Sequence, residues 1–463
     1  MCWRIIRPTR SENEVIPLSK AIDRPKFSCA LGGAIATLNA IHRAVPILHA
    51  APGCGLNLSS ALNGGSGYAG SGYVGGTALP SSNVCEKEIV FGGEERLTEQ
   101  IEKTIELIDG DLYFVLSACM VEMIGDDVRG VARGFDTPSR RVLAADTGGF
   151  RGNAYRGYEI VLETLFREFV EPVSEKKPHV VNLWGVVPAH DVFWKGNLAH
   201  LRALLGKLGL TVNTFFGEGE TVESIRRCGD AAFNLVVSDT FGLEPARVFE
   251  EVHGTPFLST AFPIGAAATD AFLREVTLAL GLPPADTETL IEAENARYFG
   301  FLARLSDVYN DYDLQRYAVI AADANYTPAL TRFLAEDIGW IPRVAVVTHP
   351  LRDDEQVRIL KRFNALNPTL RPNVVFEPNA AALQSIIRRQ WPADRGQRHQ
   401  DLYGSAVLLG SSFELDLAQD LKTPALCVSY PVTSRVVLNR GYAGYEGGLS
   451  LAEDLFSLLV SAR

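Results

Sequence analysis

The chain has 463 residues, of which 47% are hydrophobic, so it can build roughly two to four domains with large buried cores. A net charge of −11 argues against nucleic acid as the main partner. No apolar run reaches the ~18 residues needed to cross a bilayer, and the N-terminal residues lack the apolar stretch of a signal peptide. These features predict a cytoplasmic protein with no membrane partner.

The first part of the chain predicts a polar arm followed by an α/β unit. Residues 1–24 are polar and irregular, which is typical of an extended arm. Apolar runs typical of buried strands then alternate with helical patterns, and Ser28 stands where a helix N-cap is expected. The glycine- and serine-rich stretch after Cys54 predicts a loop. The predicted strands are 45–48, 112–116 and 141–145, and the predicted helices are 30–43, 94–107, 120–130 and 158–169.

Two further α/β units follow. A polar stretch with two prolines at 171–178 marks the first boundary, and a helical connector at 286–312 leads to the last unit. The predicted strands are 179–183, 210–215, 234–238 and 256–259 in the second unit, and 318–321, 344–347, 373–376, 406–409 and 426–429 in the third. Strands alternating with helices predict three doubly wound (Rossmann-like) parallel-sheet domains, with boundaries at 25–175, 176–300 and 301–463.

Three of the seven cysteines form a candidate metal site. Cys54 and Cys119 each follow a predicted strand, so both are expected at the carboxyl edge of one sheet, and Cys29 begins a predicted helix. A helix N-terminus favours thiolate, which is the form that binds iron. Unpaired cysteines are also often plain buried residues, and both readings stay open on the residues alone. Three ligands are one short for a four-iron cluster, which implies a ligand from a partner chain or of another type.

Other motifs predict little chemistry. The sequence contains no phosphate-binding Walker motif and no dinucleotide motif between strand and helix, and the glycine-rich loop at 64–76 lacks the required context. We interpret the other cysteines, Cys2, Cys85, Cys228 and Cys427, as structural or exposed thiols. His49 is expected to be a buried, hydrogen-bonded histidine, with a supporting role beside Cys54 as the alternative.

Three motifs of the first unit resemble nitrogenase component 1 subunits, and most closely the β-type chain. They are FSCALGGAIATLNAIHRAVPILHAAPGCG, EIVFGGEERL and SACMVEMIGDDVRGV, and they occur in the family's order. The C-terminal stretch YPVTSRVVLNRGYAGYEGGLSLAEDL and the three-domain pattern fit the same family. The resemblance therefore covers nearly the whole chain.

The resemblance implies an electron-transfer role. Carried over by motif, Cys29, Cys54 and Cys119 hold an [8Fe-7S] P-cluster at the interface with an α-type subunit, in an α2β2 heterotetramer that an ATP-hydrolysing iron protein reduces. The family's complex iron–sulfur cofactor lies in the α-type chain, bound by a cysteine and a histidine. This chain has no histidine after His399 and resembles the non-catalytic partner, so no catalytic residue is expected in it. Phe91 matches a family residue at the docking surface for the iron protein, with ordinary core packing as the alternative.

Some features depart from the molybdenum enzyme. Gly149 stands where the nitrogen-fixing β chain has a serine that ligates the oxidised cluster, the loop after Cys54 looks longer, and the large N-terminal extension is absent. These departures favour a nitrogenase-like reductase with methylthio-alkanes as leading substrates and dinitrogen as the alternative. A cofactor-assembly scaffold with a [4Fe-4S] cluster fits three cysteines equally well. A metal-free α/β solute-binding or regulatory protein with buried thiols is the third hypothesis.

Overall fold

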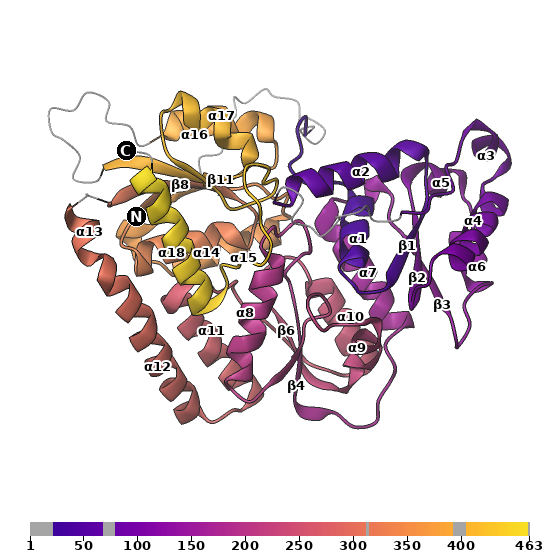
Figure 1. Ribbon diagram of the computed structural model, residues 1–463, viewed down its shortest axis with the longest axis horizontal. Coiled ribbons are helices and arrows are strands. Elements are labelled where there is room, and N and C mark those ends of the chain that lie inside the picture. The colour runs from indigo at the N-terminus through magenta and orange to yellow at the C-terminus, as the bar shows by residue number, and fades with distance from the viewer. Residues whose placement is uncertain (1–21, 68–78, 312–313, 392–403, 462–463) are drawn as a thin grey trace.

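The computed structural model describes residues 22–67, 79–311, 314–391 and 404–461. Three parallel sheets lie in chain order along the described residues, each with helices packed around it (Figure 1). Most of the predicted arm at 1–24 and of the glycine-rich loop at 64–76 lies outside the described residues. No helix among the described residues is long and apolar enough to cross a membrane.

The first sheet has the order β1-β2-β3, and its parallel strands end flush with one another. His49, Ser117 and Asp146, which end the three strands, stand side by side in the register. The segments that follow the strands therefore begin at the same edge. The elements of this unit are α1 (Ala30–Asn39), β1 (Ala44–His49), α2 (Pro52–Gly65), α3 (Glu86–Phe91), α4 (Glu94–Leu107), β2 (Leu112–Ser117), α5 (Cys119–Ile124), α6 (Val128–Arg133), β3 (Arg141–Asp146) and α7 (Ala154–Glu168).

The second sheet has the order β5-β4-β6-β7, so the chain starts at an inner strand and crosses to both sides. Such a reversal leaves a crevice outside the carboxyl ends of the strands. The elements are β4 (Lys177–Trp184), α8 (Trp194–Gly206), β5 (Thr211–Asn213), α9 (Val222–Arg227), β6 (Ala231–Val236), α10 (Leu243–His253), β7 (Phe257–Ser259) and α11 (Gly265–Leu280).

The third sheet has the order β10-β9-β8-β11-β12, and it also reverses direction around its first strand. The long connecting helix α12 (Pro284–Leu302) runs along the outside of the molecule in Figure 1, beside the C-terminal helix α18 (Gly444–Ser461). The other elements are α13 (Ser306–Asp311), β8 (Arg316–Ala322), α14 (Tyr326–Arg332), β9 (Ile341–Val347), α15 (Asp353–Asn364), β10 (Asn373–Phe376), α16 (Ala380–Gln390), β11 (Gly404–Gly410), α17 (Leu415–Asp420) and β12 (Ala425–Cys427).

Burial explains the sequence patterns. Strand β2 is an unbroken apolar run because all six of its residues are buried, as expected for a parallel strand covered by helices on both faces. Helix α4 is amphipathic because Leu97, Ile101 and Thr104 face the core while its other positions are less buried. The predicted fold class, three parallel-sheet α/β domains, is confirmed by the solved structure described below. The domain boundaries stay predictions.

Several predicted elements differ from the structure. The predicted helix 30–43 ends at Asn39, and Arg43 adopts a φ of 62°, which no helix continues through. The N-cap of that helix is Cys29 and not Ser28. The predicted helix 120–130 is split into α5 and α6 because Gly125 adopts a left-handed conformation that ends α5. The connector at 286–312 is divided into α12 and α13 by a short 3-10 turn at Ala303–Leu305.

The largest difference lies after Cys54. The predicted loop begins instead as helix α2, which contains Cys54 in its first turn. Pro52 stands at the start of the helix, where its fixed φ suits the helical conformation and its missing N–H is not needed. Leu62 is buried, and Gly65 packs on the ring of Tyr430. Tertiary contacts of this kind outweigh the low helix propensity of glycine and serine.

Candidate functional site

The structure brings Cys29, Cys54 and Cys119 together at the carboxyl edge of the first sheet. Cys119 follows the end of β2 by two residues and begins α5, and Cys54 follows the end of β1 in the first turn of α2. Cys29 reaches the same edge as the N-cap of α1. All three are free thiols, with Cys119 exposed and the other two half-buried. The prediction that two cysteines share one sheet edge follows from the parallel register and agrees with this geometry.

Gly149 lies against two of these cysteines. It follows the end of β3 by three residues, and its backbone N–H donates to Cys119 Sγ at 2.9 Å. A Cβ at this position would lie 3.2 Å from Cys119 Sγ and 3.3 Å from Cys29 Cβ. A side chain at position 149 would crowd both cysteines, so the glycine lets the backbone N–H come close to Cys119 Sγ. The loop after each of the three strands contributes one residue to the site.

Charge and burial act together on Cys54. Burial raises the pKa of its thiol, and the neighbouring Cys29 and Cys119 raise the pKa further because a second thiolate would be repelled. A bound metal cation would stabilise the thiolate and so lower the pKa of Cys54, since thiolates are the form that metals bind. Among the described residues, no group of three or more histidine, cysteine or acidic side chains is arranged to hold a metal ion.

Glu122 fixes the loop that carries Gly149. Its carboxylate accepts hydrogen bonds from the Gly148 backbone N–H at 2.6 Å and from Ser117 Oγ at 2.7 Å. Arg151 donates to the other oxygen at 2.7 Å. Glu122 stands one turn after Cys119 on α5, so it ties the loop after β3 to the helix that begins with Cys119. Glu122 is not among the site residues predicted from the sequence, although an acidic side chain three positions after a candidate ligand is a readable signal.

His49 is a buried, hydrogen-bonded residue, as expected. Its Nε2 lies 2.9 Å from Asp126 Oδ2 and its Nδ1 lies 2.8 Å from Ser82 Oγ. Burial lowers the pKa of the imidazole more than the Asp126 carboxylate raises it. The ring is therefore neutral near pH 7 and donates a hydrogen bond to Asp126. Asp126 also accepts from the Gly93 backbone N–H at 2.9 Å, which links the end of β1 to the start of α4.

Of the remaining cysteines, Cys228 and Cys427 are buried and Cys85 is exposed at the N-terminus of α3. Their burial agrees with the prediction of structural or exposed thiols, whose lack of a further role stays a prediction, and Cys2 lies outside the described residues. Phe91 ends α3 with 82% of its surface exposed, so the core-packing alternative for this residue is wrong. Its neighbour Val90 is also exposed.

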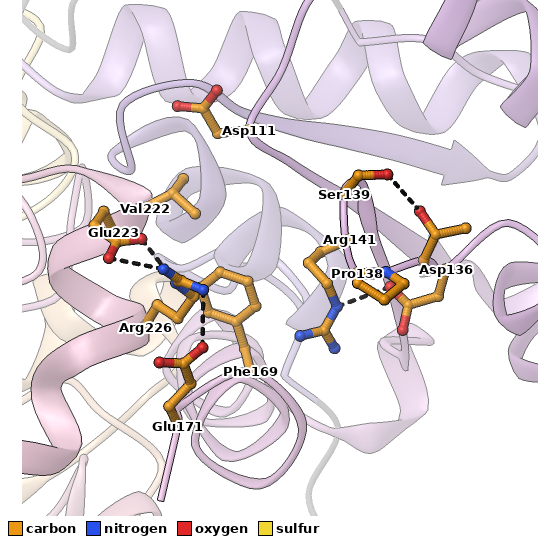
Figure 2. A pocket seen from close by; sticks show the side chains of 11 residues that line it. Asp111, Asp136, Pro138, Ser139, Arg141, Phe169, Glu171, Val222, Glu223 and Arg226 are labelled. Carbon is orange, nitrogen blue, oxygen red and sulfur yellow. Dashed lines mark hydrogen bonds and ion pairs between the residues drawn. The ribbon is translucent and has the colours of Figure 1, made fainter. Parts of the chain in front are cut away.

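A pocket of about 610 Å³ lies at the opposite, amino edge of the first sheet. Figure 2 shows Arg226 between Glu223 and Glu171, and Arg141 facing Asp136. Each of these guanidinium groups is paired, at 2.7 Å to Glu223 and 2.8 Å to Asp136. The pocket is a polar groove between the first and second units, with its cationic groups already neutralised.

The fold and the site define a class of protein: three parallel-sheet α/β units, with three thiols gathered at one edge of the first. The sequence model described as nitrogenase component 1 type oxidoreductase matches residues 29–459. The chain belongs to this family.

Individual relatives agree with the assignment. The chain is similar to the nitrogenase molybdenum-iron protein beta chain of Methanococcus maripaludis, with 24% identity over 97% of both chains. It is also similar to the nitrogenase iron-molybdenum cofactor biosynthesis protein NifE of Methanococcus maripaludis strain S2, with 27% identity over 58% of this chain and 55% of that protein. A solved structure, Nitrogenase Cp1 at pH 6.5, matches with a TM-score of 0.76 and 18% identity over 97% of this chain and 95% of that chain, and so shares its fold.

Proposed function

We propose that this chain is the β-type electron-transfer subunit of a nitrogenase-like reductase. In this proposal Cys29, Cys54 and Cys119 are the chain's ligands to an [8Fe-7S] P-cluster-type group, whose other ligands come from an α-type subunit in an α2β2 heterotetramer. The cluster receives electrons from an ATP-hydrolysing iron protein and passes them to a complex iron–sulfur cofactor in the α-type chain. The family's oxidoreductase classification supports this role.

The single observation that carries the proposal is the convergence of three partly exposed thiols at one edge. A purely structural cysteine is buried in the core, whereas Cys119 is exposed and the other two are half-buried. Large apolar side chains around the thiols are also exposed, namely Leu56 on α2, Met123 on α5 and Phe150 beside Gly149. Three thiols are too few ligands for the proposed cluster, and they are surrounded by exposed apolar side chains. Such a surface suits a site to which a partner chain adds the remaining ligands.

The residues present fit an iron–sulfur cluster. Thiolates are the usual cluster ligands, and Gly149 places no side chain between Cys29 and Cys119. When bound, the cluster supplies one-electron transfer at low potential. The chain's own groups orient the thiols: Glu122 holds the loop of Gly149, and the Gly149 N–H donates to Cys119 Sγ. Hydrogen bonds to the ligand sulfur adjust the reduction potential.

Methylthio-alkanes are the proposed substrates, with dinitrogen as the alternative. The basis is Gly149, which offers no side-chain oxygen beside Cys119 where the nitrogen-fixing β chain has a serine. The similarity to a cofactor biosynthesis protein favours a second candidate function, an assembly scaffold that holds a [4Fe-4S] cluster. Cluster size separates the two functions, because both use the same three cysteines.

The test compares iron and sulfide content and the electron paramagnetic resonance spectrum of the anaerobically co-purified complex, before and after Cys54→Ala. About eight irons per interface, with further iron in the partner, support the reductase, and about four support the scaffold. We expect Cys54→Ala to remove most of the interfacial iron and to weaken assembly with the α-type chain. Turnover of methylthio-alkanes is then compared with turnover of dinitrogen.

Cys85→Ala is the matched control, because Cys85 is an exposed thiol of the same unit that lies outside the three-thiol site. This variant should keep the full iron content and spectrum. A Cys54→Ala complex with unchanged iron and activity would show that the ligand assignment is wrong. If the wild-type complex contained no iron, the three thiols would be structural and the proposed function would be wrong.

A further inference from the structure

The segment immediately before Cys29 is held by all three α/β units. Residues 22–28 cross the molecule from the third unit to the start of α1 in the first. The Arg24 backbone pairs with the loop before α16: its N–H donates to Asn379 Oδ1 at 3.2 Å, and its carbonyl accepts from the Ala380 N–H at 2.9 Å. The Arg24 guanidinium also stacks on Phe413. The segment is therefore anchored to the third unit before it reaches Cys29.

Lys26 makes the strongest of these contacts. Its ammonium group lies 2.9 Å from Glu414 Oε2, which belongs to the turn after β11 and is 388 residues away in the chain. Both side chains are buried, with 0% of Lys26 and 3% of Glu414 exposed. The Ser411 N–H and Oγ donate to the same carboxylate oxygen at 2.8 Å each. A buried ion pair with such support fixes geometry, because losing one partner leaves a buried charge unpaired.

Ser28 connects the segment to the second unit. Its Oγ lies 3.1 Å from His190 Nε2, and His190 belongs to the loop after β4. The His190 ring is fully buried, and its Nδ1 has no hydrogen-bond partner among the described residues. The hydrogen bond between Ser28 Oγ and His190 Nε2 forms with either tautomer of the ring, because the hydroxyl can donate or accept. The Ser28 carbonyl accepts from the Ala154 N–H at 2.8 Å, which adds the first unit to the set of anchors.

Cys54 and Cys119, unlike Cys29, are positioned by hydrogen bonds within the first unit. The first turn of α2 closes locally, with the Cys54 N–H bonded to the Ala51 carbonyl at 3.1 Å. Among the described residues, the hydrogen bonds from the third unit to α2 are at its last turn, from Tyr430 Oη to the Ala61 carbonyl and from the Val432 N–H to the Gly65 carbonyl. Cys119 is bonded to Gly149 within the first unit. Cys29 is thus the one of the three whose own neighbours in sequence are fixed by the second and third units.

We propose that Lys26 and Ser28, through Glu414 and His190, are positioning residues for Cys29, so that the placement of the second and third units sets the position of one of the three thiols. The proposal rests on the proposed function only for what Cys29 binds. The placement of the thiol is a property of this chain and can be measured without the cluster. In this proposal each residue acts through Cys29.

The first experiment measures the alkylation rate of each thiol in the full-length chain purified without its cluster, by iodoacetamide labelling and mass spectrometry. The variants are Ser28→Ala and the double substitution Lys26→Met with Glu414→Gln, which leaves no unpaired charge. We expect the labelling of Cys29 to become roughly fivefold faster in each variant, with Cys54 and Cys119 unchanged, because one local anchor is lost. Ser28→Ala removes a single hydroxyl and keeps the test available if the double variant does not fold.

Asp239→Asn is the matched control. Asp239, in the loop after β6, pairs with Arg362 of α15 at 2.8 Å, so its loss weakens contact between the second and third units without touching residues 22–28. This variant should leave all three labelling rates unchanged. Equal acceleration of all three thiols in the Ser28 or Lys26 variants would mean general loosening and would overturn the proposal, as would an unchanged Cys29 rate.

The second readout is the holo complex. We expect the Ser28→Ala complex to keep most of its iron while its electron paramagnetic resonance line shape and the midpoint potential of the interfacial cluster shift. An unchanged spectrum and potential, together with an unchanged Cys29 rate, would exclude a positioning role. If the wild-type complex contains no iron but Cys29 still responds alone in the labelling test, the proposed function fails while the positioning inference stands.

Discussion

Two buried histidines have no countercharge to support protonation. His349, in the loop after β9, packs edge-on against Tyr155 with ring centroids 4.1 Å apart, and its Nδ1 has no hydrogen-bond partner among the described residues. Burial lowers its pKa to about 3, and burial likewise lowers the pKa of His190 to about 4. Both rings are therefore neutral near pH 7. Their roles are packing and, for His190, a hydrogen bond with Ser28.

Because the pKa of His349 is lowered, the free energy of unfolding depends on pH in the acidic range. An unfolded histidine has a pKa of about 6.5. Between pH 6.5 and about pH 3, His349 is protonated in the unfolded state but neutral in the folded state. Its contribution to the free energy of unfolding is therefore complete above pH 6.5 and is lost progressively as the pH falls. His349→Phe does not titrate. We expect the variant to match the wild type near pH 7.5 and to exceed it by about 2 kcal/mol near pH 5.

The measurement is the unfolding midpoint of both proteins across this pH range, under anaerobic conditions. The difference between the two proteins isolates His349 from the other titrating groups, because those groups are common to both. If the unfolding midpoints of the two proteins changed in parallel from neutral to acidic pH, His349 would be protonated in the folded state at acidic pH.

At the scale of elements, the crossing of α1 and α7 decides where Cys29 lies. A Cβ on Gly33 would lie 1.8 Å from the Ala154 carbonyl oxygen, and a Cβ on Gly157 would lie 1.9 Å from the Ala30 carbonyl oxygen. Both contacts are to backbone, so no side chain can move aside. The two glycines let the helices approach so closely that the N-terminus of α1 meets the loop between β3 and α7.

Gly157→Ala should push α1 away from α7 and displace Cys29 from Gly149. Overpacking of this kind costs about 3 kcal/mol, and we expect a lower thermal unfolding midpoint together with a reduced interfacial iron content. Gly64→Ala on α2 is the control, because nothing lies within 4 Å of a Cβ there, and alanine in a helix should stabilise by about 0.5 kcal/mol. A Gly157→Ala protein as stable as the control would show that the helices can separate without cost.

The elements that sequence predicts well are those with one dominant signal. Helix α4 and strand β10 occur at the predicted residues because amphipathic periodicity and a short apolar run each leave little choice. The sequence predicts a loop in place of helix α2 because the packing partners of this helix, such as Tyr430, lie far away in the chain. The same distance hides the anchors of Cys29. Sheet register places Cys54 and Cys119, but no local pattern shows that Glu414 reaches Lys26.

At the scale of the whole molecule, the carboxyl edges of the three sheets meet. Asn325, after β8, donates to the carbonyls of Gly185 after β4 and Val237 after β6, at 3.0 and 3.3 Å. Tyr155 from the first unit packs between His349 and Phe241 of the other two. The chain's own side chains therefore occupy part of the crevices expected at the strand-order reversals of the second and third sheets, and a pocket of about 120 Å³ lined by Asp239, Phe262 and Asn325 remains there. This arrangement suits a subunit whose site thiols are partly exposed at the first sheet.

Phe91 allows a test of whether the first unit presents a docking surface for the iron protein. The residue ends α3 and is followed by Gly92, with a φ of 91°, and by Gly93, whose N–H is bonded to Asp126. Asp126 in turn contacts His49 at the end of β1, so this exposed ring is rigidly tied to the sheet edge that presents the thiols. As the proposed docking site for the iron protein, Phe91 should contribute to association and not to folding.

We expect Phe91→Ala to leave the unfolding midpoint unchanged, since 82% of the side chain is exposed, and to raise about tenfold the iron-protein concentration that half-saturates electron transfer. The control is Leu278→Ala on α11, an equally exposed apolar residue of the second unit, with 85% exposure. It should change neither quantity. Loss of an aromatic anchor at a docking surface acts through dissociation, so maximal turnover at saturating iron protein should also persist. If Phe91→Ala lowered stability and left the iron-protein dependence unchanged, the ring would be part of the fold, and docking would have to be sought elsewhere on the first unit.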